Sequence, residues 1–76
     1  MNTFNIYPNP ISDILNIQHY SDINKITIYN MLGQQVLTKN VSATSTQIDM
    51  SALTNGTYLL KVEAGSVSKT IKVFKK

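Results

Sequence analysis

The sequence predicts an all-β domain, a sandwich or barrel of about seven short antiparallel strands. Apolar and polar residues alternate in short runs along most of the chain, and turn residues separate these runs. No window repeats apolar residues at the i, i+3, i+4, i+7 spacing of an amphipathic helix, whereas β-branched residues and tyrosines are dense. At 76 residues the chain is one small domain with a thin core.

The expected strands follow from period-two alternation. In the segment 14–20, for example, Leu15 and Ile17 share one face while Asn16 and Gln18 share the other. The predicted strands are 4–7, 14–20, 23–30, 34–39, 45–50, 57–64 and 67–76. The same alternation predicts these inward-facing residues: Phe4, Ile6, Leu15, Ile17, Ile26, Ile28, Val36, Ile48, Leu53, Tyr58, Leu60, Val62, Ile71 and Val73.

Turn chemistry predicts how the strands are joined. The segment 30–33 suits a type I turn that begins at Asn30, with Gly33 as the left-handed residue of a G1 bulge. Gly65 is free to take a positive φ in a tight hairpin between the last two strands. Asp49 is expected to cap a single turn that ends at Leu53, and Gly56 lies in the turn that follows it. The polar segment 40–45 is expected to be a mobile loop.

The segment Tyr7-Pro8-Asn9-Pro10 is expected to end the first strand. Each proline lacks a backbone donor and forces the residue before it into extended geometry. Strand pairing must therefore stop at Tyr7, and the chain crosses in extended form toward Leu15. Nothing in this segment is a nucleophile or a base.

Composition argues against several classes of function. The net charge is +3 and all seven basic residues are lysines, so the arginine forks typical of nucleic-acid readers are missing. The sequence has no cysteine, which excludes disulfides, thiolate metal sites and a cysteine nucleophile. It has no apolar stretch near the ~20 residues of a membrane span. No secretory signal peptide is visible, because Pro8, Pro10 and Asp13 interrupt the first segment.

The sequence shows no catalytic, metal or cofactor site. His19 is the only histidine and continues the face of Leu15 and Ile17, so we expect a structural role for it. The carboxylates are too widely separated for a calcium loop or a paired-carboxylate site; they are Asp13, Asp22, Asp49 and Glu63. We expect no small-molecule substrate.

Two surface features remain. Tyr29, Leu59 and Phe74 point away from the predicted core face of their strands and are candidates for an exposed apolar patch. The final Lys75 and Lys76 are expected to be solvated, and they also lie where a recognition tail would sit.

These features together resemble the type A C-terminal sorting domain of the type IX (Por) secretion system of Bacteroidota. The similarity runs from about Phe4 to Lys76. Five markers occur in order: Tyr7-Pro8-Asn9-Pro10, Gly33-Gln34 after Tyr29-Asn30, Asp49 through Leu53, Gly56-x-Tyr58, and Lys75-Lys76. The resemblance implies an Ig-like β-sandwich without catalytic activity, spanning residues 1–76 as a single domain excised from a larger secreted protein.

The resemblance also implies partners and a location. Such domains are recognised by the outer-membrane translocon and its shuttle, commonly cut by a sortase-like protease, and attached to an upstream cargo that is secreted or held at the cell surface after passing through the periplasm. We expect recognition to use the last strand as an exposed edge. The candidate recognition residues are Tyr58, Lys69, Lys72, Phe74, Lys75 and Lys76.

Two other functions stay open. A stand-alone Ig-like adhesive or carbohydrate-binding module would carry a planar aromatic cluster on one sheet. A structural spacer in a larger surface protein would have domains on both sides, whereas the ending "KTIKVFKK" is interpreted as a true chain end.

Overall fold

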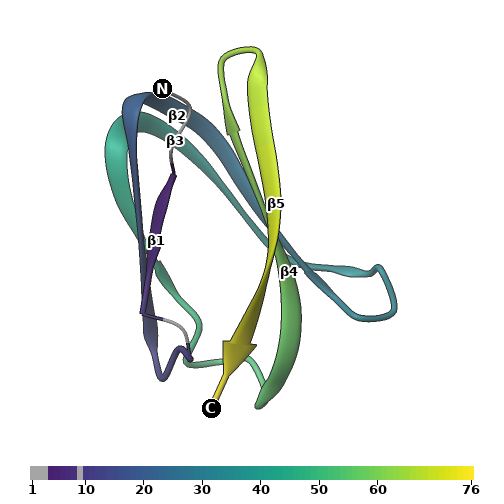
Figure 1. Ribbon diagram of the computed structural model, residues 1–76. Helices are drawn as coiled ribbons and strands as arrows, with labels where there is room; N and C mark the ends of the chain where they lie inside the picture. The colour runs from purple at the N-terminus through teal and green to yellow at the C-terminus, as the bar shows by residue number, and fades with distance from the viewer. Residues whose placement is uncertain (1–3, 9) are drawn as a thin grey trace.

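The computed structural model describes residues 4–8 and 10–76, which form an antiparallel β-sheet that curls on itself (Figure 1). Its strands are β1 (Asn5–Tyr7), β2 (Ile14–Asn30), β3 (Gln35–Asp49), β4 (Gly56–Ala64) and β5 (Val67–Lys75). The strand order is β1-β2-β4-β5, and β3 pairs with β2 along most of its length. The prediction of an all-β sandwich is confirmed.

The sandwich arises because the long β2–β3 ribbon passes through both layers. One half of β2 pairs with β1 and with the end of β3, and the other half pairs with β4 and the start of β3. Register shifts between Gln18 and Lys25 interrupt the ladder where the ribbon bends. Bulges increase the local bend and twist of a strand, so they let one ribbon serve two layers.

The number of strands differs from the prediction, which was about seven, whereas residues 4–8 and 10–76 form five. The predicted strands 14–20 and 23–30 form one strand, β2, and 34–39 and 45–50 join in β3. The predicted loop 40–45 is part of β3, with Asn40 paired to Lys25 and Ala43 to Ile23. This loop prediction was wrong because backbone hydrogen bonds maintain a strand through polar residues that show no apolar alternation.

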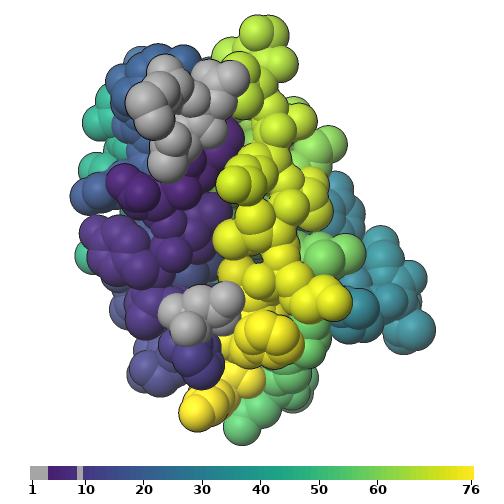
Figure 2. Space-filling view, viewed as in Figure 1, coloured from purple at the N-terminus to yellow at the C-terminus, as the bar shows by residue number. Residues whose placement is uncertain are grey.

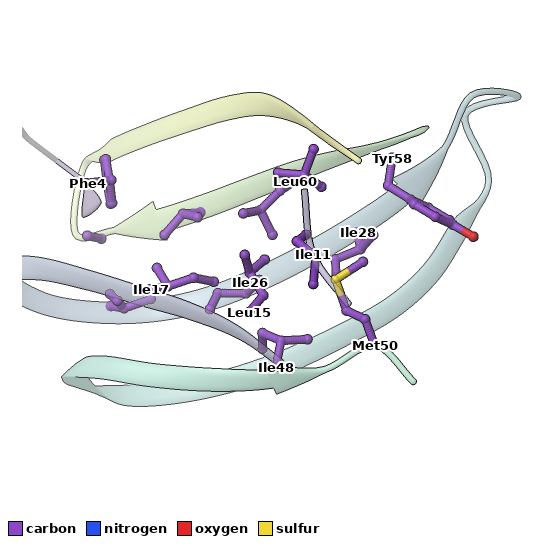
Figure 3. Close-up of a cluster of buried hydrophobic side chains, with 14 residues drawn as sticks. Phe4, Ile11, Leu15, Ile17, Ile26, Ile28, Ile48, Met50, Tyr58 and Leu60 are labelled. Atoms are coloured by element: carbon purple, nitrogen blue, oxygen red, sulfur yellow. The ribbon is translucent and has the colours of Figure 1, made fainter. Parts of the chain in front are cut away.

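The core lies between the two layers (Figure 3). Leu15, Ile17 and Ile48 come from one layer, and the other layer contributes residues of β2, β4 and β5. Most predicted inward residues are buried, and Ile6, Leu53 and Ile71 are partly buried against the core. The buried apolar residues are Phe4, Ile11, Leu15, Ile17, Ile23, Ile26, Ile28, Ile48, Met50, Tyr58, Leu60, Val62, Ala64 and Val73.

The prediction for Val36 was wrong, because its side chain is 37% exposed. The neighbouring Leu37 packs against the core instead and pairs with Ile28. A register shift between Ile28 and Tyr29 accompanies the turn at Gly33. Since a shift of one residue moves a side chain to the opposite face, this bulge explains the error.

The β4–β5 hairpin turns at Gly65 as predicted. Ala64 pairs with Val67, and Gly65 has a φ of 64° while no other residue type in the described chain has a positive φ. This pattern fits a type II′ turn, whose first central position favours glycine. The Gly65 N–H also donates to the side-chain oxygen of Asn24, which fastens the hairpin to the bend of β2.

Candidate recognition surface

Strand β5 lies at an edge of the sheet, as predicted, and its atoms are exposed down the front of the molecule beside β1 (Figure 2). Its side chains alternate between two faces. Val73 is buried in the core, whereas Lys72 and Phe74 point to the outside, and Phe74 is 47% exposed. An exposed edge strand is a template on which another chain can add a strand, and lysines on it discourage pairing with an identical edge.

Lys72 and Phe74 belong to a larger row on the outer face, which we call the outer patch: Tyr29, Leu59, Lys72 and Phe74. Tyr29 pairs with Leu59 across β2 and β4, and Leu59 pairs with Lys72 across β4 and β5. Phe74 lies diagonally from Leu59, a separation that an aromatic side chain spans. The register therefore brings together the apolar residues predicted to face outward, with one lysine among them.

The other candidate lysines lie elsewhere. Lys69 pairs with the buried Val62 and so projects on the opposite side of β5 from Lys72, where it is exposed. Lys75 is only 8% exposed, so the expectation that it is solvated was wrong. Its Nζ donates to the carbonyl oxygen of Lys76 at 3.2 Å. Lys76 itself is exposed.

The burial of Lys75 follows from a contact with the crossover segment. Ile11 forms a parallel bridge with Lys75. The Ile11 N–H donates to the Phe74 carbonyl at 2.7 Å, and the Lys76 N–H donates to the Ile11 carbonyl at 2.8 Å. The last residues of β5 are thus paired on both sides, with β4 and with Ile11, and the open edge is confined to the earlier part of the strand.

Tyr58 is a structural residue in this arrangement. Its side chain is 6% exposed, and its hydroxyl donates to the carbonyl oxygen of Thr54 at 2.6 Å. A tyrosine near the start of a strand that bonds to backbone a few residues upstream is the tyrosine corner of β-sandwiches. Tyr58 was predicted to be a recognition residue, and a side chain this buried has little surface to offer a partner.

The predicted structural motif maps onto chain connections. Strand β1 ends at Tyr7, as expected from the prolines, and the Tyr7–Pro8 peptide bond is cis. Asn9 lies outside the described residues. Pro10 precedes Ile11, a residue of the crossover whose side chain lies in the core and has no exposed surface.

Gly33 and Asp49 have the predicted turn geometry. Gly33 has a φ of 83°, and its N–H donates to the Asn30 carbonyl at 3.0 Å, as in a type I turn followed by a G1 bulge. The Asp49 side chain accepts a hydrogen bond from the Ser51 N–H at 2.9 Å. Hydrogen bonds from the Ser51 side chain and backbone hold the pKa of Asp49 below its ordinary value of 3.8. Gly56 begins β4 opposite Lys75.

Sequence reasoning missed several buried residues at connections. Ile11, Ile23 and Met50 have no exposed surface, yet they lie in the crossover, the bend of β2 and the turn after β3. Ile11 lies outside every predicted strand and Ile23 is out of phase with Ile26 and Ile28, whereas Met50 shares the parity of Ile48 but ends its predicted strand.

The side chains that could bind a metal ion or take part in acid–base chemistry are dispersed. Among residues 4–8 and 10–76, no three His, Cys, Asp or Glu side chains gather as a metal site would require. His19 is buried as expected for a structural residue, and its ring stacks on Phe4 with centroids 4.0 Å apart. Within the same ranges, no helix has the length and apolar character needed to cross a bilayer.

A shallow depression of about 410 Å³ lies on the layer opposite the outer patch. Amide and hydroxyl side chains form most of it, and the Gln47 side chain donates to Asn16 Oδ1 at 3.0 Å within it. The lining residues are Tyr7, Asn16, Ile17, Gln18, Ser45, Thr46 and Gln47.

An exposed edge strand beside an apolar row is a surface on which another chain can add a strand, as in several peptide-recognition domains. Residues 5–76 match the family model described as "Secretion system C-terminal sorting domain". The chain therefore belongs to the family of secretion system C-terminal sorting domains, a sorting-signal family and not a catalytic one. No curated protein matches the chain.

One similar solved structure is PorZ of Porphyromonas gingivalis, described as an essential bacterial surface component of the type-IX secretion system. The TM-score is 0.75 at 18% sequence identity, over 96% of this chain and 11% of PorZ. At this identity the likeness establishes the fold alone. The chain spans only about 11% of the length of PorZ.

Proposed function

We propose that this domain is a non-catalytic sorting signal that the type IX machinery recognises in order to export an attached cargo across the outer membrane. The single observation that carries the proposal is the family match over residues 5–76. In this proposal residues 1–76 form one domain at the C-terminus of a larger protein, and the cargo ends secreted or at the cell surface after passing through the periplasm. Its partners are the translocon with its shuttle and a sortase-like protease.

Recognition in this proposal uses the exposed part of the basic edge and the outer patch. Lys69, Lys72 and Lys76 are exposed, and Phe74 adds apolar area beside Lys72. A surface of this kind suits an acidic receptor, because lysines steer an anionic partner and the aromatic side chain adds buried apolar area. The buried Tyr58 and Lys75 support this surface from inside.

The test is export of a reporter that carries an N-terminal signal peptide and this domain at its C-terminus. In a Bacteroidota host with an active type IX system we expect the reporter outside the cell, and in a translocon-deficient strain we expect it in the periplasm. Equal export from both strains would contradict the proposal.

Point variants are needed to test the surface itself. Deletion of residues 74–76 would also remove the backbone hydrogen bonds to Ile11, so its effect mixes recognition with stability. The triple variant Lys69→Gln, Lys72→Gln, Lys76→Gln keeps the backbone and removes three charges. We expect reduced export of this variant. The control is Lys25→Gln, Lys39→Gln, which removes two charges from β2 and β3.

Glycan binding is a second candidate function, favoured by the polar depression. Side-chain amides beside an exposed Tyr7 offer the donors, acceptors and ring face that bind sugars. A glycan panel tests it: binding that Gln47→Ala abolishes supports this function, and no binding to any glycan argues against it.

A further inference from the structure

The β2–β3 hairpin carries bulky apolar side chains at its end. We call Met31, Leu32 and Val36 the hairpin tip. Met31 is 58% exposed, Leu32 is 83% exposed and Val36 is 37% exposed. One exposed leucine is ordinary on a protein surface. The β2–β3 hairpin extends beyond the rest of the chain (Figure 1), with Met31 and Leu32 in its turn and Val36 at the start of β3, and the core of this domain does not include these three side chains.

The turn below the hairpin tip is held in one shape by Asn30. Its side-chain oxygen accepts hydrogen bonds from the N–H groups of Leu32 and Gln34, each at 3.0 Å. Its side-chain nitrogen donates to Gln34 Oε1 at 2.8 Å. The Asn30 N–H donates to the Gln34 carbonyl at 2.9 Å, so the base of the turn is also closed by backbone.

This rigidity matters for binding. A contact surface that is already ordered loses little conformational entropy when a partner covers it. Apolar side chains on a preformed turn are suited to enter a complementary pocket, as anchor residues do at protein interfaces.

The absence of charged residues around the hairpin tip limits the kinds of partner that it can bind. No charged residue lies between Lys25 and Lys39 in the sequence. A segment that inserts into an anionic membrane surface is typically rich in Lys or Arg and carries interfacial aromatic residues such as Trp. The hairpin tip has only neutral amides beside its apolar residues, which favours an uncharged protein pocket over a lipid surface.

The polar depression of a second copy is a poor site for the hairpin tip. It is lined mainly by amide and hydroxyl side chains. Burying Leu32 there would leave those polar groups without water and without new hydrogen bonds.

We propose that the hairpin tip inserts Met31 and Leu32 into an apolar, uncharged pocket of a protein component of the export machinery. This inference rests on the proposed function and adds a second contact, distinct from the basic edge of β5. The two contacts differ in chemistry: the hairpin tip binds through apolar burial, whereas the edge binds through charge and strand pairing.

The test uses the same reporter fusion with the double variant Met31→Ser, Leu32→Ser. Because both side chains are exposed, we expect an unchanged urea midpoint of the purified domain. We expect export to fall by at least about tenfold, the loss typical of removing an apolar anchor. The matched control is Ile14→Ser, which removes an exposed apolar side chain of β2 far along the strand; it should leave export unchanged. The conservative variant Leu32→Met, with Met31 unchanged, keeps two apolar side chains and should be exported as well as the unaltered reporter.

The outcomes separate this inference from the proposed function. If the unaltered reporter is not exported, the proposed function fails and the partner named here fails with it. If the unaltered reporter and the double variant are exported equally, the inference is overturned while the proposed function stands. Export loss in both the double variant and Ile14→Ser would also overturn it.

Two further measurements test whether the hairpin tip binds a lipid surface or a second copy of this chain instead. Co-sedimentation with vesicles of phosphatidylcholine and phosphatidylglycerol should show no binding of the domain, and binding that the double variant loses would assign the hairpin tip to a lipid surface. Sedimentation velocity should show a monomer, and a dimer that the double variant dissociates would assign the hairpin tip to self-association. Either result would overturn the proposal.

Discussion

Ile11 and Lys75 lie side by side in a parallel bridge that joins the crossover after β1 to the end of β5. Two backbone hydrogen bonds flank the bridge, at 2.7 and 2.8 Å. Ile11 has no exposed surface, so its side chain packs in the core while its backbone holds the last strand. The segment with the two prolines therefore ends β1 and leads to Ile11, which pairs with the end of β5 on the side away from β4.

The first prediction follows from this double role of Ile11. Ile11→Ala should lower the free energy of unfolding by about 2–5 kcal/mol, because it removes a fully buried side chain and leaves a cavity. Urea denaturation followed by circular dichroism measures the change. Ile14→Ala is the control, since Ile14 is exposed and should change stability by about 0.5 kcal/mol or less. Equal losses in the two variants would contradict the assignment of Ile11 to the core.

The second prediction concerns the hydroxyl of Tyr58. Tyr58→Phe keeps the buried ring but removes the donor to the Thr54 carbonyl. The expected loss is about 0.5–1.5 kcal/mol of unfolding free energy, the net contribution of one hydrogen bond. Tyr7→Phe is a matched control on an exposed tyrosine and should lie near zero. A Tyr58→Phe variant as stable as the parent would show that the corner contributes no net stability.

The sequence predicted the parts of the fold that local chemistry determines. Alternation identified the inward faces of β4 and β5, and turn residues located the hairpins at Gly33 and Gly65, because both signals act over a few residues. The continuity of β3 through 40–45 was missed, since backbone pairing with β2 across the bend leaves no side-chain pattern.

The candidate surface was predicted less completely than the fold. Alternation placed Phe74 outside correctly, and Lys75 has the same parity as the buried Val73. Lys75 was nevertheless expected in solvent, because lysines are rarely buried and the contact with Ile11 joins segments far apart in the sequence. Contacts of this kind depend on how the sheet curls, which short-range patterns do not encode.

The third prediction tests the backbone at Gly33. A Cβ at this position would meet no atom within 4 Å, so a substitution acts only through the φ of 83°. Gly33→Ala should cost about 1–2 kcal/mol, because the left-handed conformation is unfavourable for residues with a side chain. Gly33→Asn should cost less, since asparagine tolerates this conformation. Thermal unfolding of both variants measures the difference, and an alanine variant no less stable than the asparagine variant would contradict it.

The fourth prediction concerns acid stability and Asp49. The pKa of Asp49 is lower in the folded protein than its ordinary value of 3.8, chiefly because the Ser51 side chain and then the Ser51 backbone donate to the carboxylate. A group whose pKa falls on folding binds more protons in the unfolded state. Its stabilising contribution is therefore present above 3.8 and is lost as the pH falls through the lower folded value.

Asp49→Asn isolates this contribution, because asparagine keeps an acceptor oxygen but carries no titrating charge. The unfolding midpoint of the parent should fall more steeply than that of the variant as the pH decreases below about 4, while the two profiles should run parallel from about pH 5 to 7. Urea titrations at each pH measure both profiles. Asp22→Asn is a suitable control, since it removes an exposed carboxylate with the same change of charge. Profiles of parent and Asp49→Asn that stay parallel through the acid range would show that the bond to Ser51 does not stabilise the turn after β3.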